Sequence, residues 1–208
     1  MTTFFFDYIS PYSFIACRLL ERSGQGWTPA PVVLGSILSH RGVQGPGEED
    51  VRRHAGLVDL LLLCAHYDIP VEGPAKHPFN SVPALRTTLA VHETGRARVV
   101  ARFFEAAWSE GVDLESTATL QALLDELKIE VDAEAATFDR SLRAQLKADT
   151  RTFIERGGFG VPTVAEGQLL FFGHDRLELA RAYAEGRIEL DEAKLAHMGG
   201  RPRPPRLT

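Results

Sequence analysis

The first apolar run of the chain is short and rich in aromatic residues. It extends from Thr3 to Ile9 and predicts a buried β-strand. Ser10 suits a helix N-cap, Pro11 suits the first helical position, and apolar residues then recur at helical spacing up to Gly24, a residue type that often ends helices. A second apolar run, Pro31 to Leu34, predicts another strand. The N-terminal part therefore predicts a β-α-β unit with Ser10 at the strand-to-helix turn.

The middle of the chain has a different period. From about Glu48 to Arg156, apolar residues fall three and four positions apart, which is typical of helices that bury one face. We expect roughly five to seven helices here, by this periodicity. The segment from Arg143 to Arg156 is highly charged and predicts a helix with a solvated face. The helical spacing is seen in residues such as Leu57, Leu60, Leu61 and Cys64, and again in Leu120, Leu123, Leu124 and Leu127.

Strand patterns return near the C-terminus. After the glycine-rich loop 157–160, a strand begins at Val161 to Val164, and Glu166-Gly167 predicts a hairpin turn. The returning strand covers residues 168–172. A helix then opens at His174-Asp175-Arg176 and continues to Ala184.

This order of elements is that of an α/β thioredoxin fold with a large all-helical insertion after the second strand. The thioredoxin-like domain is predicted to be discontinuous, with residues 1–35 and 157–190, and the helical insertion covers residues 36–156. Residues 191–208 are predicted to be a partly disordered tail that ends in the basic, proline-rich stretch 201–206.

Composition and charge exclude several classes of function. The formal net charge is -5, which argues against a nucleic-acid-binding surface. No stretch approaches the roughly 18 apolar residues of a membrane span, and no signal peptide precedes the first strand, so we expect a cytosolic protein. Cys17 and Cys64 form no CxxC pair, and the seven histidines lack the spacing of a helical metal site, so no metal is expected.

Ser10 is the first candidate for chemistry. A helix that begins there offers free backbone N–H groups and the positive end of the helix dipole, which stabilise an anion. A serine hydroxyl is a poor nucleophile unless a base activates it, and no histidine lies nearby in the sequence. We therefore interpret Ser10 as a hydrogen-bond donor to a bound thiolate, while a plain N-cap is the alternative.

Two later segments complete a possible site for glutathione. Pro162 is a candidate cis proline, which would leave the backbone of Val161 available to an extended peptide; an ordinary loop proline is the alternative. Asp175, between His174 and Arg176, could bind the ammonium of a γ-glutamyl group or could simply cap its helix. Together these segments predict contacts for the thiol, the cysteinyl backbone and the γ-glutamyl end of glutathione.

The same segments carry a family resemblance. Residues 6–13 (FDYISPYS), 77–86 (HPFNSVPALR), 159–163 (FGVPT) and 172–177 (FGHDRL) resemble the 2-hydroxychromene-2-carboxylate isomerases. These enzymes are grouped with the kappa-class glutathione transferases, in the DsbA-like branch of the thioredoxin superfamily. The resemblance spans nearly the whole chain, up to about Gly186.

The resemblance implies a reaction and further site residues. Glutathione thiolate would add reversibly to a conjugated enone and so interconvert 2-hydroxychromene-2-carboxylate and trans-o-hydroxybenzylidenepyruvate, or a related aromatic substrate. The resemblance implies that Asn80, Ser81 and Tyr12 contact the substrate, although Asn80 also suits a helix cap. It further implies a homodimer. The alternatives are a kappa-like transferase or peroxidase that consumes glutathione, and a protein of this fold without isomerase activity; a disulfide oxidoreductase is disfavoured because no CxxC is present.

The chain departs from the family pattern on the substrate side. Ser39 stands where the family often has a lysine, and His54 stands near the usual Arg-Tyr pair. Arg41, Arg52 or Arg53 could supply the missing positive charge. Cys17 lies on the same helix as Ser13 and could be a reactive thiol, but a buried apolar role is favoured for it and for Cys64.

Overall fold

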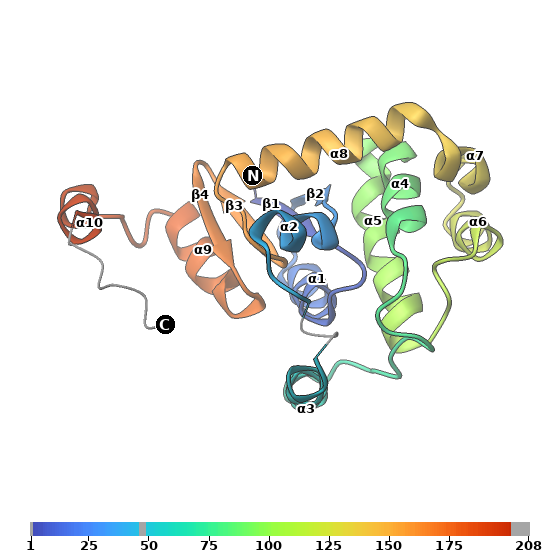
Figure 1. The fold of residues 1–208 in the computed structure, drawn as a ribbon, viewed down its shortest axis with the longest axis horizontal. Helices are drawn as coiled ribbons and strands as arrows, with labels where there is room; N and C mark the ends of the chain where they lie inside the picture. The colour runs from blue at the N-terminus through green and yellow to red at the C-terminus, as the bar shows by residue number, and fades with distance from the viewer. Residues whose placement is uncertain (1, 46–48, 201–208) are drawn as a thin grey trace.

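The structure is a computed structural model that describes residues 2–45 and 49–200 of the 208-residue chain (Figure 1). Its centre is a four-stranded mixed sheet in the order β2-β1-β3-β4. The first two strands are parallel, and β3 pairs antiparallel with both β1 and β4. The strands are β1 (Thr2–Phe6), β2 (Trp27–Pro31), β3 (Thr163–Glu166) and β4 (Leu169–Phe172). The predicted thioredoxin-type order of elements is confirmed.

Side chains of β1 alternate between the two faces of the sheet. Phe4 and Phe6 enter the main core, which extends into the helical insertion, whereas Phe5 packs on Phe153 of α8 (Arg140–Glu155) with ring centroids 4.6 Å apart. Both faces are therefore covered by apolar side chains, as the uninterrupted aromatic run predicted. Helix α1 (Pro11–Ser23) follows the strand and ends at Gly24, whose φ of 67° is left-handed.

The second strand was predicted too late in the chain. It ends at Pro31, and Leu34 instead begins α2 (Leu34–Arg41). The reason is tertiary: the backbone N–H of Leu34 donates to Asp7 Oδ2 at 2.8 Å, which starts the helix there. The strand tolerates Pro29 and Pro31 because β2 is an edge strand, where a missing N–H leaves no ladder bond unmade.

The helical insertion contributes helices to both faces of the sheet and contains six α-helices between residues 49 and 156, a number within the predicted range. Helix α8 crosses one face of the molecule, and its charged residues are mostly exposed, as predicted, while Leu146, Thr150 and Phe153 are buried. These six helices are α3 (Asp50–His66), α4 (Val82–Ala90), α5 (Glu93–Phe104), α6 (Thr117–Glu126), α7 (Ala133–Phe138) and α8, with a π-helical turn, η2 (Glu105–Ser109), directly after α5.

The C-terminal part follows the prediction through the hairpin. Gly167, at φ 58°, makes the tight turn between β3 and β4. A 3-10 turn, η3 (His174–Arg176), then leads into α9 (Leu177–Ala184). Within the segment predicted as a partly disordered tail, Glu192–Gly199 forms helix α10, which projects from the body of the molecule (Figure 1). The basic stretch 201–206 lies outside the described residues. No helix in the described ranges has the length and apolarity needed to cross a bilayer.

Candidate functional site

Ser10 lies at the carboxyl end of β1 and caps α1. Its Oγ accepts the N–H of Ser13 at 3.1 Å, so the capping interpretation is correct as far as it goes. The same hydroxyl also faces the cis-proline loop, where it donates a long hydrogen bond of 3.5 Å to the carbonyl oxygen of Val161. The residue is only 4% exposed. Ser10 therefore joins the first and second predicted segments directly.

Asp7 stabilises the turn at Ser10 through hydrogen bonds, a role that the sequence did not predict. Its Oδ1 accepts the N–H of Ile9 at 3.2 Å, its Oδ2 accepts that of Leu34, and its backbone carbonyl accepts that of Ser10 at 3.0 Å. Burial raises the pKa of the Asp7 carboxyl, and bonds from the Ser81 side chain and the two N–H groups partly oppose this rise. Asp7 thus ties the end of β1 to the starts of α1 and α2.

Two side chains from the helical insertion form hydrogen bonds with backbone carbonyls of the same turn. Trp108 Nε1 donates to the carbonyl of Tyr8 at 2.8 Å, and His77 Nε2 lies 2.9 Å from the carbonyl of Ile9. Because a carbonyl only accepts, that histidine nitrogen carries a proton. The two rings also meet edge to face, with centroids 5.5 Å apart. Neither residue stands out in the sequence, because the contacts join positions 100 and 68 residues apart.

The second segment has the predicted geometry: the Val161–Pro162 peptide bond is cis. Val161 is buried, and its N–H donates to no group in the described part of the chain. The Pro162 carbonyl accepts the N–H of Gly173 at 2.9 Å. That bond brings the third segment, which begins at Gly173, beside the second.

The third segment contacts Tyr12, the second residue after Ser10. The imidazole of His174 stacks on the ring of Tyr12, with centroids 5.8 Å apart and planes 7° apart. Partial burial lowers the pKa of His174, against the opposing effects of Asp175 and Asp59. Asp175 itself is half exposed and pairs with Arg176 at 2.7 Å. All three predicted segments therefore converge at one edge of the sheet.

The side chains predicted to contact the substrate differ in their environments. Tyr12 is partly buried, and its hydroxyl donates to Asp59 Oδ2 of α3 at 3.0 Å; burial and then this carboxylate raise the pKa of Tyr12 to about 12. Ser81 is 5% exposed and turns toward Asp7, which gives it a supporting position.

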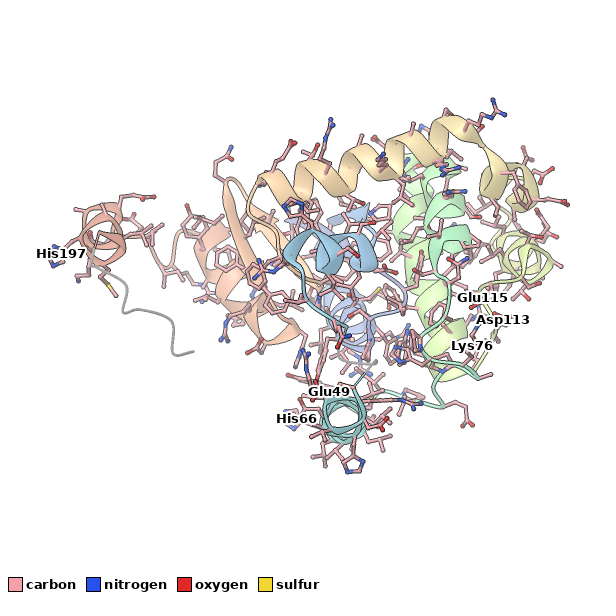
Figure 2. The ribbon with its side chains drawn as sticks, in the orientation of Figure 1. Glu49, His66, Lys76, Asp113, Glu115 and His197 are labelled. Atoms are coloured by element: carbon pink, nitrogen blue, oxygen red, sulfur yellow. The ribbon has the colours of Figure 1, made fainter. Side chains whose placement is uncertain are left out.

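Asn80 behaves as the capping alternative predicted. Its Oδ1 accepts the N–H of Val82, at the start of α4, at 3.2 Å, and its own N–H donates to Glu115 at 2.7 Å. Lys76 lies 3.2 Å from the same carboxylate. Figure 2 shows Lys76, Asp113 and Glu115 gathered in this corner of the helical insertion. The backbone bond from Asn80, followed by the bond from Lys76, lowers the pKa of Glu115.

The three arginines considered for the missing positive charge lie in different places. Arg41, near the end of α2, stacks over the ring of Phe159 at 5.5 Å, two residues before Val161. Arg52 is on α3 and lies 3.8 Å from Glu49, and Arg53 is exposed on the same helix. Only Arg41 of the three contacts the cis-proline loop.

The cysteines take the apolar role that was favoured for them. Cys17 and Cys64 are 0% and 1% exposed and belong to the main core. Burial raises the pKa of both thiols, that of Cys17 most strongly, which opposes thiolate formation. Among the residues that the structure describes, no group of three His, Cys, Asp or Glu side chains could hold a metal ion.

Comparison with known proteins agrees with this geometry. Residues 2–184 match the model of the DSBA-like thioredoxin domain. The chain is 30% identical to a 2-hydroxychromene-2-carboxylate isomerase of Pseudomonas putida over 210 residues, covering 93% of this chain and 98% of the relative. It is 33% identical to the enzyme of the same name from Pseudomonas sp. (strain C18), covering 84% and 85% of the two chains.

Two further matches extend the comparison. Human glutathione S-transferase kappa 1 is 26% identical, with coverage of 84% of this chain and 86% of the relative. A solved structure of a 2-hydroxychromene-2-carboxylate isomerase superposes with a TM-score of 0.80 at 26% identity, over 93% of this chain and 98% of that chain. The chain therefore belongs to the DsbA-like thioredoxin family and, within it, to the family of the 2-hydroxychromene-2-carboxylate isomerases.

Proposed function

We propose that this protein is a glutathione-dependent isomerase that interconverts 2-hydroxychromene-2-carboxylate and trans-o-hydroxybenzylidenepyruvate, or a closely related aromatic pair. The observation that carries the proposal is the approach of the Ser10 hydroxyl, at the N-terminus of α1, to the backbone of Val161 beside a cis proline. Relatives with this activity in their names match nearly the whole chain, which supports the same conclusion.

The residues present fit glutathione. The unused N–H of Val161 and its weakly bonded carbonyl can pair with the cysteinyl backbone as a short added strand. Asp175 is exposed enough to exchange its Arg176 partner for an ammonium group, and Arg176 is then free to meet a carboxylate. The hydroxyl of Ser10 remains as the donor to a sulfur at the helix N-terminus.

The chain's own groups then perform two tasks. Glutathione, when bound, supplies a thiolate that adds reversibly to the conjugated double bond and so permits rotation about it. Ser10 and the N-terminus of α1 stabilise the negative charge on that sulfur and lower the pKa of its thiol. Pro11 has no N–H and that of Ser13 donates to Ser10, so Tyr12 supplies the N–H that can meet the sulfur. Asp7, His77 and Trp108 hold the turn in place, so that the Ser10 hydroxyl has only to turn its proton from the Val161 carbonyl to the sulfur.

Arg41 is our choice for the substrate's carboxylate. It reaches the loop that carries Val161, and it makes no ion pair within the described residues. A guanidinium can bind a carboxylate through two parallel hydrogen bonds, which orients as well as attracts the substrate. Tyr12 and Asn80 remain proposed contacts to the aromatic part, whereas we assign Ser81 to the support of Asp7.

A transferase or peroxidase of the kappa type is the second candidate, favoured by the match to human glutathione S-transferase kappa 1. Product analysis separates the two. An isomerase with catalytic glutathione converts many equivalents of chromene acid while the total free thiol stays constant. Loss of thiol in step with substrate would assign the transferase activity, and absence of any turnover with bound glutathione would leave a binding protein.

The proposed use of glutathione bears on the compartment and the metabolic role of the protein. We propose that the protein works in the cytosol, where glutathione is kept reduced, and that it takes part in the catabolism of aromatic compounds. We further propose that it acts as a homodimer.

A further inference from the structure

A cavity of about 200 Å³ lies along the free edge of β2. Residues 29–32 of the strand line one side of it, α8 lines another, and Leu89 of α4 and Arg96 of α5 complete the lining. Figure 1 shows β2 beneath α8 and beside α4 and α5. None of Ser10, Val161 and Asp175 lines this cavity, so it is separate from the candidate site.

Much of the lining is apolar and buried. Phe5 and Phe153 belong to the smaller core between the sheet and α8, and Val32 and Leu89 are exposed by 0 and 6%. Small-molecule sites combine such an apolar lining with a few polar groups. A protein cavity of about 150 Å³ holds one benzene molecule, so this cavity has room for a somewhat larger ligand.

The strand edge offers the cavity hydrogen-bond acceptors without donors. The Val32 N–H donates to the Phe6 carbonyl at 3.0 Å, so the backbone groups of alternate residues face β1, and the carbonyls of Pro29 and Pro31 face the open edge. Both prolines are buried, and no donor in the described residues bonds to their carbonyls. Because proline has no N–H, this edge cannot form the alternating bonds of an added strand. The two carbonyls are therefore left for a small ligand that carries its own donors.

Two side chains of opposite charge also line the cavity, and they form no ion pair with each other. Arg96 Nε and Nη2 donate to the carbonyls of Val91 and Leu89, each at 3.0 Å, and Arg96 Nη1 bonds to none of the described residues. Asp149 is partly buried and has no ion-pair partner within the described ranges. Partial burial raises the pKa of the Asp149 carboxyl, and Gln145 and the charge of Arg96 partly oppose that rise.

Arg156 is the other charged residue of the lining. It is exposed, its guanidinium lies 6.0 Å from the centre of the Phe5 ring, and its Nη2 donates to the carbonyl of Gly167 at 2.9 Å. Since these contacts hold Arg156, Arg96 is left as the cation for a ligand.

We propose that this cavity binds a free α-amino acid with a branched aliphatic side chain, of the size of leucine. The carboxylate of the ligand accepts a bond from Arg96 Nη1. Its ammonium donates to Asp149 and to a carbonyl of the strand edge, and its side chain packs on Phe5 and Phe153. A zwitterion satisfies both unpaired charges, whereas a ligand with one charge leaves either Arg96 or Asp149 without a partner.

Calorimetric titration of the protein with L-leucine, in the absence of glutathione, tests the proposal without recourse to catalytic activity. Binding should be saturable. Two analogues, 4-methylpentanoate without the ammonium and 3-methylbutylamine without the carboxylate, should each bind about tenfold more weakly or worse. Equal binding of leucine and both analogues would overturn the proposal, and so would the absence of saturable binding, which would mean that the cavity holds only water.

Variants locate the bound leucine. Asp149→Asn keeps the shape of the side chain and should weaken leucine binding about tenfold. Glu155→Gln is the matched control, because Glu155 is an exposed acid on the same helix outside the lining. Ala30→Leu should abolish binding by filling the cavity, and circular dichroism establishes that each variant is folded. Unchanged affinity in Asp149→Asn would contradict the assignment.

A competition experiment separates this cavity from the proposed glutathione site. The γ-glutamyl end of glutathione is itself an α-amino acid group, so leucine could in principle occupy the place proposed for it at Asp175. S-methylglutathione should leave leucine bound, because the two sites share no residue. Displacement of leucine by S-methylglutathione would overturn the proposal, and the outcome leaves the proposed isomerase activity untouched.

Discussion

The proposed thiol side and the proposed substrate side of the candidate site are built from different kinds of groups. The thiol side consists mostly of backbone groups: the N-terminus of α1, the Val161 backbone and the turn held by Asp7. The substrate side consists of exposed side chains on α2 and in the loop before α4, such as Arg41 and Asn80. The proposed thiol side thus depends mainly on backbone geometry and the proposed substrate side on side-chain identity, and the departures from the family pattern that the sequence indicates, at Ser39 and His54, fall on the substrate side.

Replacement of Ser10 by alanine should have the largest effect on activity. Loss of one donor to a developing or bound anion costs about 100-fold in rate, so kcat/KM should fall by about that factor. The lost N-cap should cost only about 1 kcal/mol of unfolding free energy. Steady-state kinetics and urea unfolding measure the two effects. A variant with unchanged kcat/KM at saturating glutathione would remove Ser10 from the mechanism.

Trp108→Phe tests whether the helical insertion positions the thiol side. The change leaves the carbonyl of Tyr8 buried without its donor, which costs about 1–3 kcal/mol. We also expect weaker glutathione binding, because the turn before Ser10 is released. Trp27→Phe is the matched control, since Trp27 packs edge to face on Phe4 far from this turn. Equal glutathione affinity in the two variants would contradict the positioning role.

These two cases indicate what the sequence could and could not predict. Ser10, Pro162 and the β3–β4 hairpin carry local signals in cap, proline and turn residues, and each was predicted. Asp7, His77 and Trp108 were not, because their importance comes from contacts made only in the folded chain. The end of β2 was placed too late for a similar reason: the bond from Leu34 to Asp7 decides where α2 begins, and β2 ends before it, at Pro31.

Arg41→Ala should separate the two sides of the site. Loss of a charge-assisted bond to a carboxylate costs roughly 1.5–3 kcal/mol, which corresponds to a rise in KM for the chromene acid of about tenfold or more. Affinity for glutathione should not change. Arg156→Ala is a suitable control, because Arg156 makes a similar contact over Phe5, away from the site. A loss of glutathione binding with unchanged KM would show that Arg41 serves the thiol side.

Asp175→Ala should weaken glutathione binding and leave the KM for the chromene acid unchanged, the reverse of the effect expected for Arg41→Ala. Removal of the proposed partner of the γ-glutamyl ammonium should weaken glutathione binding about tenfold. KM for the chromene acid at saturating glutathione should stay the same. Calorimetric titration with an S-alkyl glutathione measures the first effect directly. Asp191→Ala, which removes the N-cap of α10, provides an exposed acidic control; an equal loss of affinity there would exclude a specific role for Asp175.

The smallest expected effect concerns His174 and pH. Its pKa is lowered in the folded chain, so the unfolded chain binds more protons near the ordinary histidine pKa. The contribution of His174 to stability is therefore present above the unfolded pKa and is lost as pH falls from that value through the folded pKa. The difference in unfolding free energy between wild type and His174→Gln should change slightly over that range. A difference independent of pH would mean that the partial burial of His174 does not favour the neutral ring.

The most direct test of the central claim is a spectroscopic titration of the glutathione thiol in its complex with the protein. Thiolate absorbance, followed against pH, gives the thiol pKa in the wild-type and Ser10→Ala proteins under saturating glutathione. A pKa well below that of free glutathione in the wild type, and a return toward the free value in Ser10→Ala, is the result we predict. Equal thiol pKa values in the free and bound states would contradict the role of Ser10 and the α1 N-terminus in stabilising the thiolate.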